Sequence, residues 1–180
     1  MRRIRFTAAL AAVSCFFSTC PLGFAKLPAV TSIFPAGGQR GSTFELTAAD
    51  APDPWPSAAW ASHPGIRLEP LNDKKGVYKT TIALNTPVGP HLVRFYNIDG
   101  SSQPRIFFVG MADETAEVEP NDKLDGGQFL ENTPVVVNGR LDKSGDVDSF
   151  TFRANKGDWV VALSLIHISE PTRPLYISYA

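Results

Sequence analysis

The sequence predicts an all-β protein that consists of two consecutive β-sandwiches. Short segments of alternating apolar and polar residues recur along the 180 residues, and many of them are bounded by the 15 prolines and 14 glycines. This alternation is typical of half-buried strands, and no stretch of residues 27–110 keeps a 3.6-residue period long enough for a helix. An acidic stretch, residues 111–118, lacks apolar periodicity and is expected to be a linker between the two modules.

The first module, residues 26–110, contains a series of expected strands. They are marked by Phe44 and Leu46, by Ile66 and Leu68, by Tyr78, Thr80, Ile82 and Leu84, by His91, Val93 and Phe95, and by Ile106 and Phe108. Asp99-Gly100 is a strong turn signal before the last of these strands. Several strands in a segment of about 85 residues fit one sandwich of ordinary domain size.

The stretch from Asp50 to Gly65 interrupts this series and contains Trp55 and Trp60 among four prolines. We expect a loop here that folds over one end of the sandwich and buries the tryptophans, because a buried aromatic is the commoner case. The alternative is that exposed tryptophans bind a sugar or a partner, since the rings offer large amphipathic contact surfaces.

The second module, residues 119–162, is expected to contain one short helical turn and then strands. The helical turn falls within residues 123–130, limited by Gly126-Gly127. The strands are residues 135–137, residues 149–154 and, after a turn at residues 155–158, residues 159–162.

The N-terminal 25 residues have the pattern of a secretory signal peptide. Three arginines within the first five residues precede an almost wholly apolar run, residues 6–17, and Gly23-Phe24-Ala25 offers small residues at a cleavage site. The apolar run is short for a membrane span, so a retained anchor is the less favoured alternative. A lipoprotein is a second alternative, because Cys15 and Cys20 lie near the cleavage site, although neither follows a well-formed lipobox. The sequence therefore predicts a secreted, periplasmic or cell-surface protein without a membrane span after cleavage.

Cysteine and charge content limit the function further. Both cysteines lie within the expected signal peptide, so the mature chain is expected to have no disulfide or thiol chemistry. The 17 basic and 18 acidic residues give a formal net charge of −1, and removal of the arginine-rich start leaves an acidic chain. No basic patch is present, which argues against nucleic acid or an anionic membrane as the partner.

The ends of the first module resemble the immunoglobulin-like (Ig-like) domains of the IPT/TIG family. The opening match is Pro28-Ala29-Val30-Thr31-Ser32-Ile33-Phe34-Pro35 followed by Gly37-Gly38-Gln39-Arg40-Gly41. The closing match is Val88-Gly89-Pro90-His91-Leu92-Val93 with Asp99-Gly100-Ser101. The resemblance implies an Ig-like β-sandwich, and residues 50–65 depart from it.

The second module resembles the front part of the bacterial pre-peptidase C-terminal (PPC) domain. The match consists of Glu119-Pro120-Asn121-Asp122, Asn138-Gly139, Gly145-Asp146-Val147-Asp148-Ser149-Phe150 and Lys156-Gly157, in the same order and spacing. The resemblance implies a truncated PPC-type, jelly-roll-like β-sandwich. Domains of this family are not catalytic and are appended to secreted peptidases and other exported proteins.

The resemblance also implies a calcium site, because related collagen-binding domains carry calcium on a comparable acidic segment. Carried over by position, the candidate ligands are Glu117, Glu119, Asn121, Asp122, Asp146 and Asp148. Calcium takes six to eight oxygen ligands, and carboxylates that repel each other favour a bound cation. The alternative is that these residues cap turns or are solvated, since acidic turn residues are common.

Residues 163–173 resemble one reading frame of a transposase adapter used in DNA sequencing. We therefore expect residues 163–180 to derive from an adapter and the natural chain to continue beyond Ala162. The alternative is a genuine terminal strand, because Leu163, Leu165, Ile166 and Ile168 are compatible with one.

No catalytic residues are predicted. Before residue 163 the histidines are His63 and His91, and no nucleophile elbow, zinc-binding helix or phosphate-binding loop is present. The leading hypothesis is a non-catalytic secreted binding or scaffold protein whose partner is an extracellular protein or a polysaccharide. The alternatives are the accessory N-terminal region of a secreted hydrolase, such as a peptidase, and a spacer without a ligand.

Overall fold

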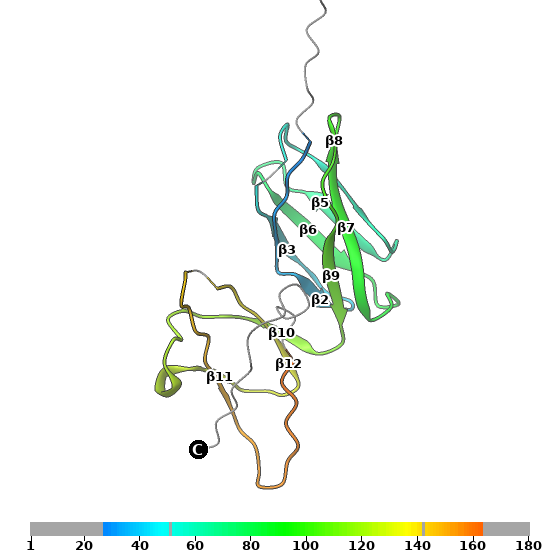
Figure 1. Ribbon diagram of the computed structural model, residues 1–180. Helices are drawn as coiled ribbons and strands as arrows, with labels where there is room; N and C mark the ends of the chain where they lie inside the picture. The colour runs from blue at the N-terminus through cyan, green and yellow to red at the C-terminus, as the bar shows by residue number, and fades with distance from the viewer. Residues whose placement is uncertain (1–26, 51, 142, 164–180) are drawn as a thin grey trace, which may run out of the picture.

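The computed structural model describes residues 27–50, 52–141 and 143–163. Residues 33–110 form two β-sheets (Figure 1). One sheet has the order β1-β3-β6-β5, made of Ile33–Phe34, Thr43–Ala48, Val77–Ile82 and Ile66–Pro70. The other has the order β2-β9-β7-β4, made of Gly37–Gln39, Arg105–Gly110, Gly89–Asn97 and Ala58–Ala61, and β8 (Gly100–Ser101) pairs with β7.

The two sheets pack face to face around one hydrophobic core, so the first module is a β-sandwich. Tyr78 from β6 and Phe95 from β7 are fully buried, and their ring centroids lie 4.8 Å apart across the core. The rings of Phe44 and Phe107 are stacked at 6.5 Å. These contacts follow from the alternation in the sequence, because every second side chain of a strand faces the same side.

The predicted strands of this module are present, but in two of them the buried side chains differ from those predicted. Leu84 is 79% exposed because β6 ends at Ile82. In β9 the buried side chains are Phe107 and Val109, whereas Ile106 is 45% exposed. Residues 106–109 are all apolar, so the sequence does not indicate which of them face the core. The pairing of β9 with β7 determines that Phe107 and Val109 do.

The two tryptophans of the predicted loop have different environments. Trp55 packs against the core, its indole contacts the ring of Tyr78 edge-on at 5.3 Å, and its Nε1 donates to Leu71 O. Trp60 instead lies in strand β4 and remains 49% exposed. The expectation of a loop was wrong at residues 58–61, because these residues pair with β7.

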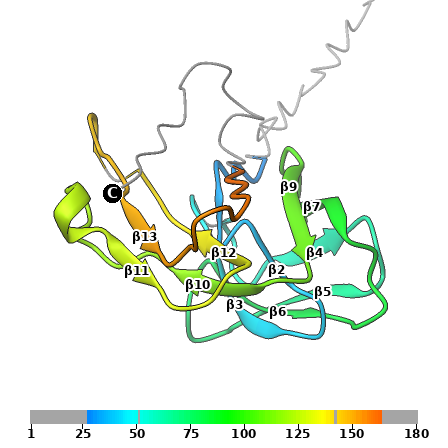
Figure 2. The ribbon, with the colours of Figure 1, turned by 90° about the horizontal axis from the view of Figure 1, so that it is seen from below.

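The second module consists of short strands beside the β2 end of the sandwich (Figure 2). Strands β10 (Asp113–Ala116) and β12 (Val135–Asn138) are parallel, as are β11 (Gln128–Leu130) and β13 (Phe150–Phe152). The 3-10 helix η1 (Leu124–Gly126) occupies the predicted helical turn. Among the described residues no helix is long and apolar enough to cross a membrane.

Two sequence expectations are corrected in the second module. Residues 113–116, expected in the linker, form strand β10, because pairing with β12 satisfies their backbone despite the acidic side chains. Residues 159–162 follow the predicted turn but form no strand, and Trp159 is 97% exposed. A strand needs a neighbour for its hydrogen bonds, and no described residue pairs with this segment.

Direct contacts join the two modules. Gln39 Nε2 in β2 donates to Met111 O at 3.0 Å and to Asp113 Oδ1 at 3.1 Å. The Arg140 guanidinium lies over the Phe34 ring, 3.7 Å from its centroid. The expected signal peptide, residues 1–25, and residues 164–180 lie outside the described part of the chain.

Candidate metal centre

Two chain segments carry the predicted ligands, and backbone hydrogen bonds bring them together. The segment of residues 117–122 follows β10, and residues 145–149, which begin in a turn, precede β13. Ser149 N donates to Asn121 O at 3.1 Å, and Gln128 N donates to Ser149 O at 2.9 Å. Side chains that are some two dozen residues apart in the sequence therefore converge.

The Gln128 side chain fixes the start of the first segment. Its Oε1 accepts a hydrogen bond from Val118 N at 2.9 Å, and its Nε2 donates to Ala116 O at 3.0 Å. The amide thus bonds the chain on both sides of Glu117, as a neighbouring strand would. Gly127 allows the close approach, because a Cβ there would lie 2.8 Å from Ser149 O.

Three of the six predicted ligands form a compact group. Glu117, Glu119 and Asp148 each offer one carboxylate oxygen, and these oxygens lie within 4.8 Å of one another. Oxygens that bind calcium at about 2.3–2.6 Å can be at most about 5 Å apart. The spacing therefore fits a shared calcium ion, whose remaining ligands would be other protein oxygens or water.

Asn121 adds a buried amide to this group. Its side chain is 1% exposed, its Nδ2 donates to Glu117 Oε1 at 2.8 Å, and its backbone N donates to Glu119 Oε2 at 3.0 Å. Asn121 Oδ1 and Asp148 Oδ1 are two of the three inaccessible side-chain atoms without a hydrogen-bond partner among the described residues. Because buried polar atoms are normally satisfied, two such oxygens beside a carboxylate group suit a cation.

The electrostatics of Asp148 show the cost of this arrangement without a cation. Burial, a hydrogen bond with Glu117 and the charges of Glu117, Asp146 and Glu119 raise the pKa of Asp148 from 3.8 to about 6. Each of these causes disfavours the ionised carboxylate. A bound divalent cation would reverse the effect and favour the ionised form.

Asp122 and Asp146 have a different partner. Lys143 Nζ lies 3.5 Å from Asp122 Oδ2 and 3.5 Å from Asp146 Oδ1. The charges of both carboxylates raise the pKa of Lys143. Of the six predicted ligands, three therefore form one group, Asn121 is hydrogen-bonded to two of these three, and Asp122 and Asp146 form ion pairs with Lys143.

We expect the contribution of Asp148 to the stability of the metal-free protein to fall as the pH rises from about 4 to about 6. The pKa of Asp148 is higher in the folded protein than its ordinary value of 3.8, so the folded state binds the extra proton in this window and loses that advantage above it. The check is urea unfolding of metal-free wild type and Asp148→Asn across this range. The stability of wild type relative to the variant should fall, and a constant difference would contradict the prediction.

Three residues at this site were not predicted. Arg140 N donates to Glu117 Oε2 at 2.8 Å, Gln128 bonds the chain on both sides of Glu117, and Lys143 pairs with two of the acids. Backbone donors such as Arg140 N leave no signal in side-chain identity. The position of Lys143 three residues before Asp146 is a local signal that could have been used.

The two histidines of the described chain have structural partners. His63 Nδ1 accepts a hydrogen bond from Gly65 N at 3.0 Å, and His91 Nε2 lies 2.8 Å from Pro87 O. Their rings contact each other edge-on, with centroids 5.8 Å apart.

No protein-family model matches the chain, and no curated protein matches it either.

Proposed function

We propose that this chain is a secreted, non-catalytic binding or scaffold protein in which an Ig-like sandwich precedes a PPC-like module stabilised by calcium. The strand orders β1-β3-β6-β5 and β2-β9-β7-β4 support the Ig-like assignment. The four-stranded sheet has the strand number of one immunoglobulin sheet, and the adjacent strands β9, β7 and β4 resemble the three strands of the other, to which β2 and β8 are additions. Secretion is supported by the pattern of the first 25 residues.

The observation that carries the calcium proposal is the pair of inaccessible oxygens, Asn121 Oδ1 and Asp148 Oδ1, beside the carboxylates of Glu117 and Glu119. These are hard oxygen ligands, which calcium prefers. The ion would neutralise the carboxylates and satisfy both oxygens, and so stabilise the fold of the second module. Its role here is structural, since the ion would tie residues 117–121 to Asp148.

Calcium should stabilise the folded chain, because it binds the assembled ligands and not the separated ones. At a free calcium concentration of about 100 times the Kd, the gain in the free energy of unfolding is about 2.7 kcal/mol. The measurement is thermal unfolding of the purified chain during calcium titration, with hydrogen exchange at the amides of Asn121 and Arg140 as a local readout.

The variant Asp148→Asn should show no calcium response, whereas Glu131→Gln, a change at an exposed acid of the same module, should respond as wild type does. An unchanged unfolding midpoint for wild type at millimolar calcium would refute the calcium proposal. A shift of equal size in Asp148→Asn would refute the assigned ligands.

A further inference from the structure

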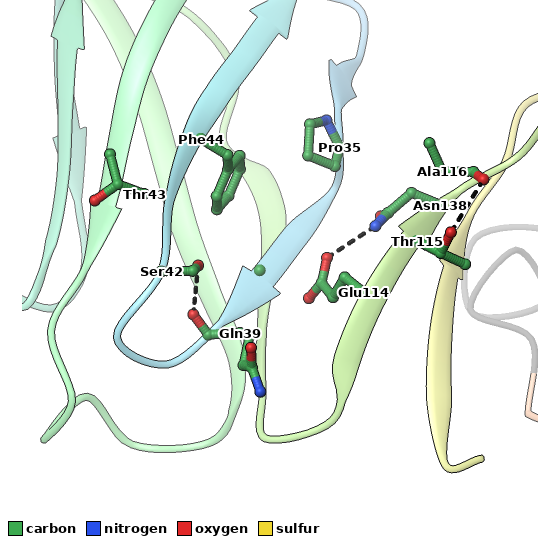
Figure 3. A pocket seen from close by; sticks show the side chains of 10 residues that line it. Pro35, Gln39, Ser42, Thr43, Phe44, Glu114, Thr115, Ala116 and Asn138 are labelled. Atoms are coloured by element: carbon green, nitrogen blue, oxygen red, sulfur yellow. Dashed lines mark hydrogen bonds between the residues drawn. The ribbon is translucent and has the colours of Figure 1, made fainter. Parts of the chain in front are cut away.

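A cavity of about 260 Å³ lies at the junction of the two modules (Figure 3). The first module contributes Pro35, Gly38, Gln39, Ser42, Thr43 and Phe44, and the second contributes Glu114, Thr115, Ala116 and Asn138. The volume is just below the range of about 300–1,000 Å³ that holds drug-sized ligands. The cavity therefore suits a group of the size of one long side chain.

The cavity contains one charged group, the carboxylate of Glu114. Glu114 and Asn138 extend from the second module toward the first, where Phe44 lies in β3 and Ser42 lies in the turn between β2 and β3 (Figure 3). Glu114 is half-buried, its Oε2 accepts a hydrogen bond from Asn138 Nδ2 at 2.8 Å, and it forms no ion pair with any described residue. None of the residues that line the cavity carries a positive charge. The cavity is therefore electrostatically complementary to a cation.

The hydrogen-bonding groups of the cavity indicate the same kind of ligand. Each lining side chain that can donate already donates to a protein acceptor; these side chains are Gln39, Ser42, Thr43, Thr115 and Asn138. The remaining capacity is mostly that of acceptors, on the Glu114 carboxylate, the hydroxyl oxygens and the amide oxygens of Gln39 and Asn138. The one remaining side-chain donor is the second N–H of Asn138 Nδ2, which has no acceptor among the described residues. Ammonium and guanidinium groups carry donors only, so they complement such a site, whereas a sugar hydroxyl or a carboxylate does not do so as well.

Phe44 provides an aromatic wall. Its ring is stacked parallel to that of Phe107, which holds it in place, and the Phe44 side chain is only partly buried. The electron-rich face of an aromatic ring attracts a cation, and the attraction is stronger when the cation is desolvated. A carboxylate together with an aromatic ring is the combination that recognises an organic cation attached to an apolar stem.

We propose that this cavity binds an organic cation, an ammonium or guanidinium group on an aliphatic stem. The source is either the lysine or arginine side chain of a partner protein or a free alkylamine, and both have the same chemistry. The inference gives the chemical class of ligand for the proposed binding role. It does not depend on calcium, because no ligand of the candidate metal centre lines the cavity.

The test is an NMR titration of the full chain with and without calcium. The probes are n-butylammonium, N-acetyl-arginine methylamide, N-acetyl-lysine methylamide, their neutral counterpart N-acetyl-citrulline methylamide, and a glycine-flanked arginine peptide. The cationic probes should give saturable shifts of the Asn138 side-chain amide and the Phe44 ring, whereas citrulline should not. Tighter binding of the peptide than of butylammonium would assign the ligand to a protein partner, and equal binding would assign it to a free amine.

Three variants make the test specific. Glu114→Gln keeps an acceptor for Asn138 but removes the charge, and it should weaken cation binding at least tenfold. Phe44→Leu should weaken it several-fold. Glu69→Gln, at an exposed position outside the cavity, should bind as wild type does. The proposal is overturned if no cationic probe saturates the shifts at 100 mM, if citrulline binds equally well, or if Glu114→Gln retains wild-type affinity.

Discussion

Replacing Phe95 with alanine should lower the free energy of unfolding of the first module by about 3–5 kcal/mol, because the change leaves a cavity in a core that cannot fully collapse. Phe95 is completely buried, and its ring contacts that of Tyr78 from the opposite sheet at 4.8 Å. A loss of this size is a large part of the stability of a small domain. Urea unfolding can be followed by tryptophan fluorescence in the background Trp60→Phe and Trp159→Phe, where the signal comes from Trp55, which contacts Tyr78.

The matched control is Leu92→Ala in the same strand. Leu92 is 44% exposed on the outer face of the sheet, so its removal should cost less than about 1 kcal/mol. Similar losses for the two variants would contradict the assignment of the inner and outer faces of β7. A large loss at Phe95 alone would support it.

Replacing Glu117 with alanine should abolish the calcium response and also destabilise the metal-free protein. The carboxylate of Glu117 accepts hydrogen bonds from Asn121 Nδ2 and Arg140 N, both at 2.8 Å. Without it the buried amide of Asn121 loses its acceptor, at a cost of about 1–3 kcal/mol. The expected signs are opposite at the two carboxylates, since Asp148→Asn removes a destabilising charge and should stabilise the metal-free protein above pH 6.

Glu117 accepts hydrogen bonds and also repels ionised Asp148, and measurements at two pH values distinguish these two effects. Below the pKa of Asp148, which is about 6, Asp148 is protonated and the loss in Glu117→Ala reflects the missing hydrogen bonds. Above this pH the loss should be smaller, because removal of Glu117 also relieves its repulsion of ionised Asp148. Urea unfolding of the metal-free variant at pH 5 and pH 8 makes this comparison. A larger loss at pH 8 than at pH 5 would contradict the assigned repulsion.

The strands of the first module could be predicted because their alternation is unambiguous. Leu46, Tyr78, Ile82, Val93 and Phe95 all face the core as the pattern requires. The prediction was wrong where the local sequence does not indicate the buried face or the presence of a strand. Residues 106–109 are uniformly apolar, so only the register with β7 places Phe107 and Val109 inside. At residues 58–61 the neighbouring prolines concealed a strand whose partner is more than 30 residues away.

The second module was harder to predict because its strands have little apolar character. Strand β10 reads Asp-Glu-Thr-Ala, and its formation depends on pairing with β12. Conversely, residues 159–162 have the composition of a strand but no described partner. In both cases the availability of a partner, and not the propensity of the segment, decided the result.

For the acidic stretch, the sequence by itself determined which oxygen ligands are available: carboxylates and an amide in two short segments, 117–122 and 146–148. Only the tertiary structure decided which of them converge. Glu117, Asn121 and Glu119 meet Asp148 because Ser149 N is bonded to Asn121 O, whereas Lys143 pairs with Asp122 and Asp146. The cavity around Glu114 likewise depends on contacts between residues 35–44 and residues 114–138, which are distant in sequence. Residue types fix the chemistry of a site, but long-range backbone pairing fixes its geometry, and no local pattern encodes such pairing.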